Sequence, residues 1–283
     1  MAKSAWKKFP YADKAYDYDG AKLKKAWDKL HRGDREPFPD AAWVEKIVAA
    51  HPKLDPKMPA TKAADALQAA WRAYHAGDFG AAVEQGEALG PIGSCVANKA
   101  ANIYATYLET DDRRQLEIFQ QSAARAEKLQ SLARDWPNAF YFHASALGRY
   151  GQFISIAKAL AEGLGSKVKS SLDKALALES DHAEAHIALG AYNAEIVAKV
   201  GGLVAGLTYG ASKDNAVKHF EAARKLIPDS AIARIEYANG LVSLFGKAKL
   251  AAATKLYEEA AATKPSDAME RLDQQAAIDE LAD

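Results

Sequence analysis

The chain has 283 residues, 49% of them hydrophobic, and its 37 Lys and Arg residues balance its 37 Asp and Glu residues. A neutral chain lacks the surplus cations with which general nucleic-acid-binding proteins displace the counterions of phosphates, so no nucleic-acid partner is expected. The length suffices for one large domain or two modest ones, each with a sizeable core.

Cysteine content and hydropathy narrow the class further. A single cysteine, Cys95, excludes an internal disulfide and a multi-cysteine zinc site. The N-terminal segment turns polar before an apolar run long enough for a signal peptide, which predicts a cytoplasmic location. The longest apolar stretch, Val200–Gly210, is far shorter than the roughly 20 residues that a membrane-spanning helix needs. No membrane span is therefore expected.

Residues 1–60 are predicted to form an N-terminal helical cap, with helices near 21–31 and 41–50 and with Asp40 as the N-cap of the second. Residues 1–36 carry ten Lys and Arg against six Asp and Glu. A basic arm that grips nucleic acid by stacking is the alternative. A cap is favoured, because terminal repeats need a cover. Its docking side chains are aromatic: Trp6, Phe9, Tyr11, Tyr16, Tyr18, Trp27 and Trp43.

Helices are predicted along the rest of the chain, because apolar residues recur with helical spacing and sustained alternation of β-branched residues is missing. A helix over 63–76 is assigned Thr61 as its N-cap. The longest helix is expected to start at Asp111 or Asp112 and to be ended by Pro137. Asp181 and Ser230 are the expected N-caps of two later helices. The predicted fold class is all-α.

An internal repeat dominates residues 61–283. Segments 216–228 and 253–265 share one pattern: Ala, an aromatic residue four positions later, Ala three after that, and Pro five further on. Segment 168–180 repeats it with Leu for the aromatic residue and Ser for Pro. Spacings of four and three place these residues on one helical face. A helix with a small residue precedes each copy, at Gly148, Gly190 and Gly240, so that two backbones can approach closely and the aromatic ring fills the groove beside them.

These residues resemble the tetratricopeptide repeat, a helix-turn-helix unit of about 34 residues. The resemblance covers residues 60 to 283, and it implies a helical solenoid with inserted helices behind the N-terminal cap. Residues 148–163, 167–185 and 191–195, with the apolar stretch after them, look like the regulator-of-microtubule-dynamics branch of repeat proteins. The T-component of tripartite carboxylate transporters is similar in layout.

No catalytic constellation can be assembled, so the chain is expected to be neither an enzyme nor a cofactor-binding protein. His182 and His186 could share a helical face, but packing is favoured over metal binding because no third ligand can be assigned. Cys95 is interpreted as a small buried thiol. The glycines of Gly201–Gly206 match no nucleotide-binding fingerprint, since neither a preceding strand nor a following Lys-Ser/Thr pair is present.

The insertion Val200–Gly210 is apolar and uncharged, with Val200, Leu203, Leu207 and Tyr209 among its large residues. Such a segment must bury itself, bind a ligand or self-associate. Packing over a neighbouring repeat is the first expectation. Closing a pocket, or forming the surface of a homodimer, remains open.

In repeat solenoids, the first helix of each pair lines the concave surface. Counting from the small residue of each such helix gives the expected groove residues: Asn98, Asn102, Phe142, Ser145, Arg149, Gln152, Glu184, Ile187, Glu195 and Asn239. The mixture of charges suits a protein or peptide segment more than a strongly acidic tail. The predicted function is a noncatalytic scaffold that binds such a partner in the groove. The alternative is a small-molecule binding protein that holds an amphipathic or hydrophobic ligand in a pocket closed by the insertion.

Overall fold

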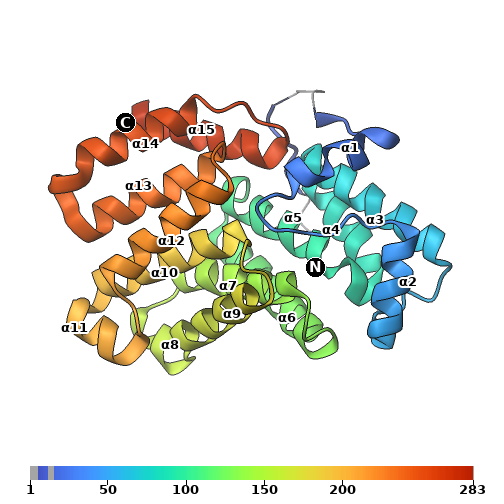
Figure 1. Cartoon of the computed structure of the whole chain (residues 1–283), viewed down its shortest axis with the longest axis horizontal. Helices are drawn as coiled ribbons and strands as arrows, with labels where there is room; N and C mark the ends of the chain where they lie inside the picture. Colours follow the sequence, from blue (N-terminus) through green and yellow to red (C-terminus); the bar gives the residue numbers. More distant parts are fainter. Residues whose placement is uncertain (1–5, 12–15, 283) are drawn as a thin grey trace. The chain divides into compact units, whose positions relative to one another are not determined.

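The computed structural model describes residues 6–11 and 16–282 (Figure 1). Within these ranges the regular structure is helical and includes no strand. The helices follow one another as a solenoid-like series of stacked pairs, which confirms the all-α fold class predicted from the sequence. None of the described helices is both long enough and apolar enough to span a bilayer.

The chain divides into two compact units, and each is described separately. Unit 1 comprises the residues up to His31, Glu36–Ser155 and Asp267–Met269. Unit 2 comprises Arg32–Arg35, Ile156–Ser266 and the residues from Glu270 onward. The expected segments 1–60 and 61–283 therefore each contribute to both units.

Unit 1 is built from helices whose short connections make neighbours antiparallel. Helix α3 packs on α4, α4 on α5, α5 on α6 and α6 on α7, while α5 also contacts α3 and α7. Helix α5 is thus the most enclosed helix of this series. The helices of unit 1 are α1 (Ala21–Leu30), α2 (Ala41–Ala50), α3 (Ala60–His75), α4 (Phe79–Ala88), α5 (Ser94–Tyr107), α6 (Asp112–Leu132) and α7 (Pro137–Gln152).

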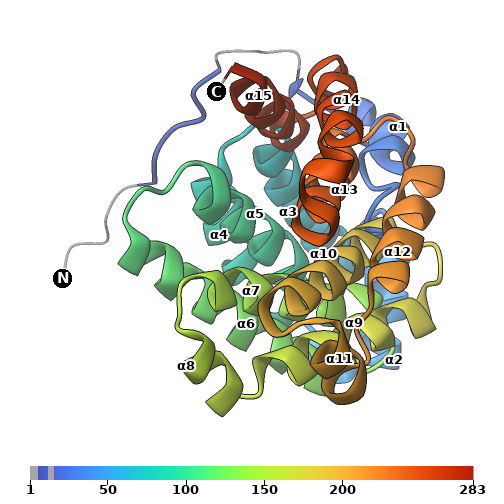
Figure 2. The same cartoon turned by 90° about the vertical axis from the view of Figure 1, so that its left-hand side faces the viewer.

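Unit 2 is organised around α10, which packs against α9, α12 and α13, while α13 also packs on α14. Both views place α8 and α11 at one end of this unit and α14 at the opposite end (Figures 1 and 2). Its helices are α8 (Ile156–Ala161), α9 (Leu164–Leu178), α10 (Ala183–Val200), α11 (Gly202–Val204), a π-helical turn (Ala205–Tyr209), α12 (Lys213–Leu226), α13 (Ala231–Phe245), α14 (Leu250–Ala261) and most of α15 (Ala268–Ala282).

Phe220 of α12 shows why the repeat pattern pairs small residues with an aromatic ring. A Cβ atom added to Gly190 of α10 would lie 2.6 Å from the Phe220 ring, and one added to Gly240 of α13 would lie 2.5 Å from it. Both distances are far inside van der Waals contact. The ring, which is 1% exposed, therefore fills the space that the two glycines leave open, as the sequence predicted.

Two aromatic residues of the N-terminal segment, Trp6 and Phe9, lie against α4 and the turn before it. Trp6 packs on Gly80 of α4, and Phe9 packs on Gly77 just before that helix; in both cases an added Cβ would lie 2.6 Å from the ring. Trp6 also meets the Tyr104 ring edge-on, with 4.4 Å between ring centres. These contacts are of the docking kind expected for a cap.

Three of the predicted N-caps are confirmed. The carboxylate of Asp40 accepts a hydrogen bond from the backbone N–H of Trp43 at 3.0 Å, at the start of α2. Asp111 does the same at the start of α6, and Ser230 at the start of α13. A short oxygen-bearing side chain at these positions satisfies an amide that has no partner within the helix.

Three other predictions about helix ends were wrong. Helix α3 begins at Ala60, behind Pro59, so Thr61 lies inside its first turn and does not cap it. Helix α10 is capped by the His182 imidazole, which accepts from the Ala185 N–H at 3.1 Å, and Asp181 does not cap it. Helix α6 ends at Leu132, and Pro137 instead opens α7, where its fixed φ suits a first helical residue.

Candidate binding site

A cluster of polar side chains lies between α5 and α6 in unit 1. Asn98 and Asn102 stand one turn apart on α5, while Ser122 and Arg125 stand one turn apart on α6. Asn98 is 1% exposed, Asn102 is 6% exposed and Ser122 is fully buried. The two asparagines are groove residues predicted from the sequence, whereas Ser122 and Arg125 were not predicted.

The antiparallel register of the two helices brings these side chains together. A guanidinium nitrogen of Arg125 donates to the Asn98 side-chain oxygen at 2.5 Å, and the Gln115 amide donates to the Ala105 carbonyl at 2.8 Å. In the register that these two bonds define, Asn102 lies at the level of the turn that carries Ser122. The cluster is therefore a consequence of helix pairing and not of a loop conformation.

Several polar atoms of this cluster have no hydrogen-bond partner. They are the amide nitrogen of Asn98, both the nitrogen and the oxygen of the Asn102 amide, and the Ser122 hydroxyl. A buried polar group left without a partner costs about 1–3 kcal/mol. Four such atoms between two adjacent helices are an unusual concentration, because native proteins pair most of their buried polar groups.

The positive charge at the edge of the cluster is already compensated. Arg125 forms an ion pair with Glu87 of α4 while it also donates to Asn98. Its side chain is 16% exposed. The unused hydrogen-bonding capacity of the site therefore belongs to neutral amide and hydroxyl groups. Such groups match other neutral amides better than they match a charged ligand.

The other predicted groove residues of unit 1 lie on α7, which packs against α5. Phe142 is buried in the core, whereas Ser145 and Arg149 are partly exposed and Gln152 is exposed. The Arg149 guanidinium lies 3.5 Å from the Gln152 side-chain oxygen. Ser145 and Arg149 thus keep some access to a partner, while the Phe142 side chain packs in the core.

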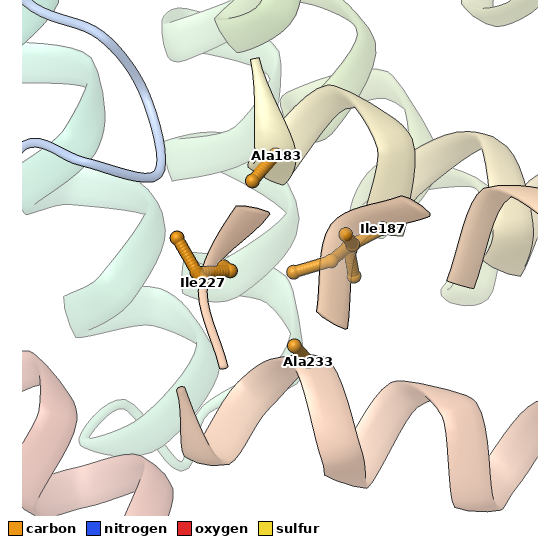
Figure 3. Close-up of a cluster of buried hydrophobic side chains, with 5 residues drawn as sticks. Ala183, Ile187, Ile227 and Ala233 are labelled. Carbon is orange, nitrogen blue, oxygen red and sulfur yellow. The ribbon is translucent and has the colours of Figure 1, made fainter. Parts of the chain in front are cut away.

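The predicted groove residues of unit 2 do not form a cluster. Ile187 belongs to a buried core with Ala183, Ala223, Ile227 and Ala233, and Figure 3 shows Ile187 and Ile227 directed toward each other. Glu195 pairs with Lys199 at 2.5 Å, and Asn239 accepts from the Tyr257 hydroxyl at 2.5 Å. The backbone N–H of Glu184 donates to the Gly33 carbonyl at 3.0 Å. Core packing occupies the Ile187 side chain, so its place in a groove stays a prediction.

The apolar insertion is only partly buried. Ala205 is fully buried, and Tyr209 lies beside α9, where a Cβ on Gly165 would be 3.3 Å from its ring. Val200 is half-buried at the end of α10. Leu203 and Leu207, however, are 78% and 82% exposed. The expectation that the insertion packs over a neighbouring repeat is therefore wrong for these two leucines, because they occupy the outer face of a helical turn held by Tyr209 and Ala205.

The histidines and the cysteine are placed by packing. His182 caps α10 and is fully buried, so it does not share a ligand-binding face with His186. His186 instead meets His219 of α12, with 2.8 Å between their Nδ1 atoms. Cys95 is buried in α5, as predicted. His219 was missed because 33 residues separate it from His186, and no local spacing signals the pair.

Ser122 could have been found from the sequence. It stands with Phe119, Ala126 and Leu129 on the apolar stripe of α6, where a polar residue is out of place. Arg125 gives no comparable signal, because a charged residue beside such a stripe is ordinary.

Comparison with known proteins adds no family to this description. No family model matches the chain, and no curated protein sequence matches it. The resemblance to the tetratricopeptide repeat thus stays a prediction from the residues named above, while the all-α, solenoid-like architecture is a property of the structure itself.

Proposed function

We propose that the protein is a noncatalytic helical-repeat scaffold that binds a segment of another protein, and that the α5–α6 cluster is a principal contact. The observation that carries this proposal is the Asn102 amide, which is buried and has neither a donor nor an acceptor partner. An asparagine side chain presents the same two groups as a peptide bond. A peptide segment that offers one N–H and one C=O would satisfy both at once, and because these atoms are buried its entry requires α5 and α6 to separate locally.

The surrounding residues favour a neutral, backbone-directed contact. Ser122 and the Asn98 amide nitrogen supply a further hydroxyl and a further donor, and Arg125 is held by Glu87. On α7, the partly exposed Ser145 and Arg149 extend the polar surface of the same unit. A partner recognised mainly through its backbone is chosen by shape and length more than by charge.

The small-molecule alternative placed the insertion over a pocket. Leu203 and Leu207 are largely exposed to solvent. Side chains that closed an apolar pocket would be largely buried, so their exposure does not support such a pocket. The orphaned amide groups of α5 favour a peptide over a hydrophobic ligand, because an apolar ligand would leave those groups unpaired. The scaffold function is therefore the better supported of the two.

Binding of the full-length chain to an array of immobilised peptides, followed by fluorescence polarisation of the best binder, tests this proposal. We expect Asn102→Leu to weaken binding at least tenfold, because leucine keeps the side-chain volume and removes both polar groups. Asn215→Leu, at an exposed position of α12 outside the predicted groove, is the control and should leave the affinity unchanged. Undiminished binding by Asn102→Leu, or no peptide bound by the wild-type chain, would contradict the proposal.

A further inference from the structure

Helices α10 and α12 of unit 2 bring two histidines into direct contact. The Nδ1 atoms of His186 and His219 are 2.8 Å apart, and the ring centres are 5.1 Å apart. The separation of the centres is close to the nitrogen–nitrogen distance plus one ring radius at each end. The two nitrogens therefore point at each other, and the rings do not stack.

The hydrogen bonds fix the tautomer of each ring. The Nε2 atom of His186 lies 3.1 Å from the Ser180 carbonyl oxygen, which can only accept, so Nε2 carries the proton. The Nδ1 atom of a neutral His186 then holds a lone pair and accepts from the Nδ1–H of His219. An outer hydrogen bond to a backbone carbonyl is the usual device that orients a metal-binding histidine.

Both rings favour the neutral form, which is the form that binds metals. Burial lowers the pKa of His219 to about 4, with the neighbouring His186 and Lys218 adding to the effect. Burial also lowers the pKa of His186, against the opposing influence of the Ser180 carbonyl and Asp181. Two ammonium groups and two carboxylates act on the pair, namely those of Lys169, Lys218, Asp173 and Asp181. At His186 the effect of Asp181 on the pKa exceeds that of Lys218, and at His219 Asp173 opposes Lys218 and Lys169, so a carboxylate opposes the lysines at each ring.

We propose that His186 and His219 form a two-histidine chelating site for a divalent transition-metal ion, with Cu²⁺ preferred over Zn²⁺. Two nitrogens in neighbouring positions of a square-planar ion, each about 2.0 Å from the metal, lie about 2.8 Å apart. Two nitrogens of a tetrahedral zinc ion lie about 3.3 Å apart. The present 2.8 Å separation is that of a hydrogen bond between nitrogens that face each other, so either arrangement requires the rings to turn, and the preference for Cu²⁺ rests on the general order of metal affinities.

Binding requires only side-chain rotation and a tautomer change. Turning the two rings directs both Nδ1 lone pairs at one ion, and the His219 proton moves from Nδ1 to Nε2. No proton is released overall. Among residues 6–11 and 16–282, no group of three or more His, Cys, Asp or Glu side chains is placed to hold a metal. Water therefore completes the coordination, and the order of affinities should follow the general series in which Cu²⁺ exceeds Ni²⁺ and Zn²⁺.

The test is a titration of the untagged full-length protein with Cu²⁺, Zn²⁺ and Mg²⁺ at pH 7 in a buffer that does not coordinate metals. We expect one strongest Cu²⁺ site, weaker Zn²⁺ binding and no Mg²⁺ binding. His186→Gln and His219→Gln should each weaken the strongest Cu²⁺ site at least tenfold. His51→Gln, which removes a histidine paired with Asp135, is the matched control and should leave that site intact.

Electron paramagnetic resonance of the wild-type Cu²⁺ complex keeps the proposal testable if a variant folds poorly. The spectrum should show coupling to two imidazole nitrogens. A strongest site that survives both substitutions would overturn the proposal, as would a spectrum with fewer than two imidazole nitrogens or Zn²⁺ binding tighter than Cu²⁺.

Discussion

The Nδ1 atom of His75 and a carboxylate oxygen of Asp267 lie 2.8 Å apart, although 192 residues separate them in the sequence. Their side chains are 1% and 2% exposed. The other ring nitrogen of His75 lies 3.3 Å from Nε2 of His31, and Trp71 stacks on the His75 ring. The pair therefore fastens the segment Asp267–Met269 to the core of unit 1.

Replacing Asp267 by Ala should destabilise the protein by about 3 kcal/mol, because the buried imidazole N–H of His75 loses its acceptor. Asp267→Asn keeps an acceptor oxygen and should cost less than half as much. Urea unfolding followed by circular dichroism measures both changes. Equal destabilisation by Ala and Asn would show that the hydrogen bond is not what this aspartate contributes.

Gly240→Ala should destabilise the fold by about 1–3 kcal/mol, because its Cβ would overlap the Phe220 ring and the core of unit 2 would have to shift. Gly148→Ala, in the last turns of α7, is the control: the close approach predicted there is wrong, since no neighbouring element lies within 4 Å of the added Cβ. That change should stabilise the protein by about 0.5–1 kcal/mol, the usual gain of Ala over Gly in a helix. Thermal unfolding of the two variants should thus move in opposite directions.

Tyr192→Phe should stabilise the protein by about 1 kcal/mol at pH 7. The Tyr192 hydroxyl is buried without a hydrogen-bond partner, so removing it removes a desolvation cost. Burial, aided by Tyr209 and Asp173, also raises the pKa of Tyr192 to about 12.

The raised pKa of Tyr192 should make the protein less stable at alkaline pH. The folded-state pKa exceeds the ordinary value of 10, so between pH 10 and pH 12 the unfolded chain ionises at this tyrosine while the folded chain must keep the proton, and the free energy of unfolding falls over that range. The wild-type protein should therefore lose stability above pH 10 more steeply than Tyr192→Phe. Parallel curves of unfolding free energy against pH would contradict this assignment.

Glu109 should make stability sensitive to acid. Although burial raises its pKa, hydrogen bonds from the backbone N–H groups of Asp111 and Thr110, the Tyr104 hydroxyl and the charge of Arg114 together hold the pKa of Glu109 below its usual range. A depressed carboxyl pKa contributes stability that is present above the unfolded-state value, about 4.3, and is lost as the pH falls through the folded-state value.

Glu109→Gln should therefore cost about 2 kcal/mol at neutral pH and flatten the stability profile below pH 4.3. Glu127→Gln on the exposed side of α6 is the control and should change neither quantity. An unfolding series from pH 7 to pH 3 measures the effect. A profile for Glu109→Gln as steep as that of the wild type would rule out the proposed role of this carboxylate.

Local chemistry made parts of this fold predictable. Asp40, Asp111 and Ser230 are caps because a short side-chain oxygen can reach a free amide within its own turn, and nothing distant competes. Phe220 and its glycines follow a spacing that helix pairing imposes. The predictions of Thr61 and Asp181 as N-caps were wrong because the N-cap positions of α3 and α10 are held by Pro59 and His182. Both are local residues, but they are less common at N-caps than Thr and Asp.

The candidate site was only half predictable. Asn98 and Asn102 stand on a predictable face of α5, but the lack of partners for Asn102 depends on what α6 and α7 place around it. The exposure of Leu203 and Leu207 likewise depends on how Tyr209 seats against α9. Contacts between segments far apart in the sequence set these properties, and no spacing rule within one helix contains them.

The exchange of short segments between the two units bears on how the chain is made. Residues 32–35 belong to unit 2, and Asp267–Met269 belong to unit 1, so neither unit is one continuous stretch of polypeptide. The ribosome synthesises the chain from its N-terminus. The hydrogen bond between His75 and Asp267 can therefore form only after nearly the whole chain has been made. Unit 1 is therefore complete only once residues 267–269 have been made, shortly before the last residues of unit 2, and a gene divided at Ser155 would encode two incomplete halves.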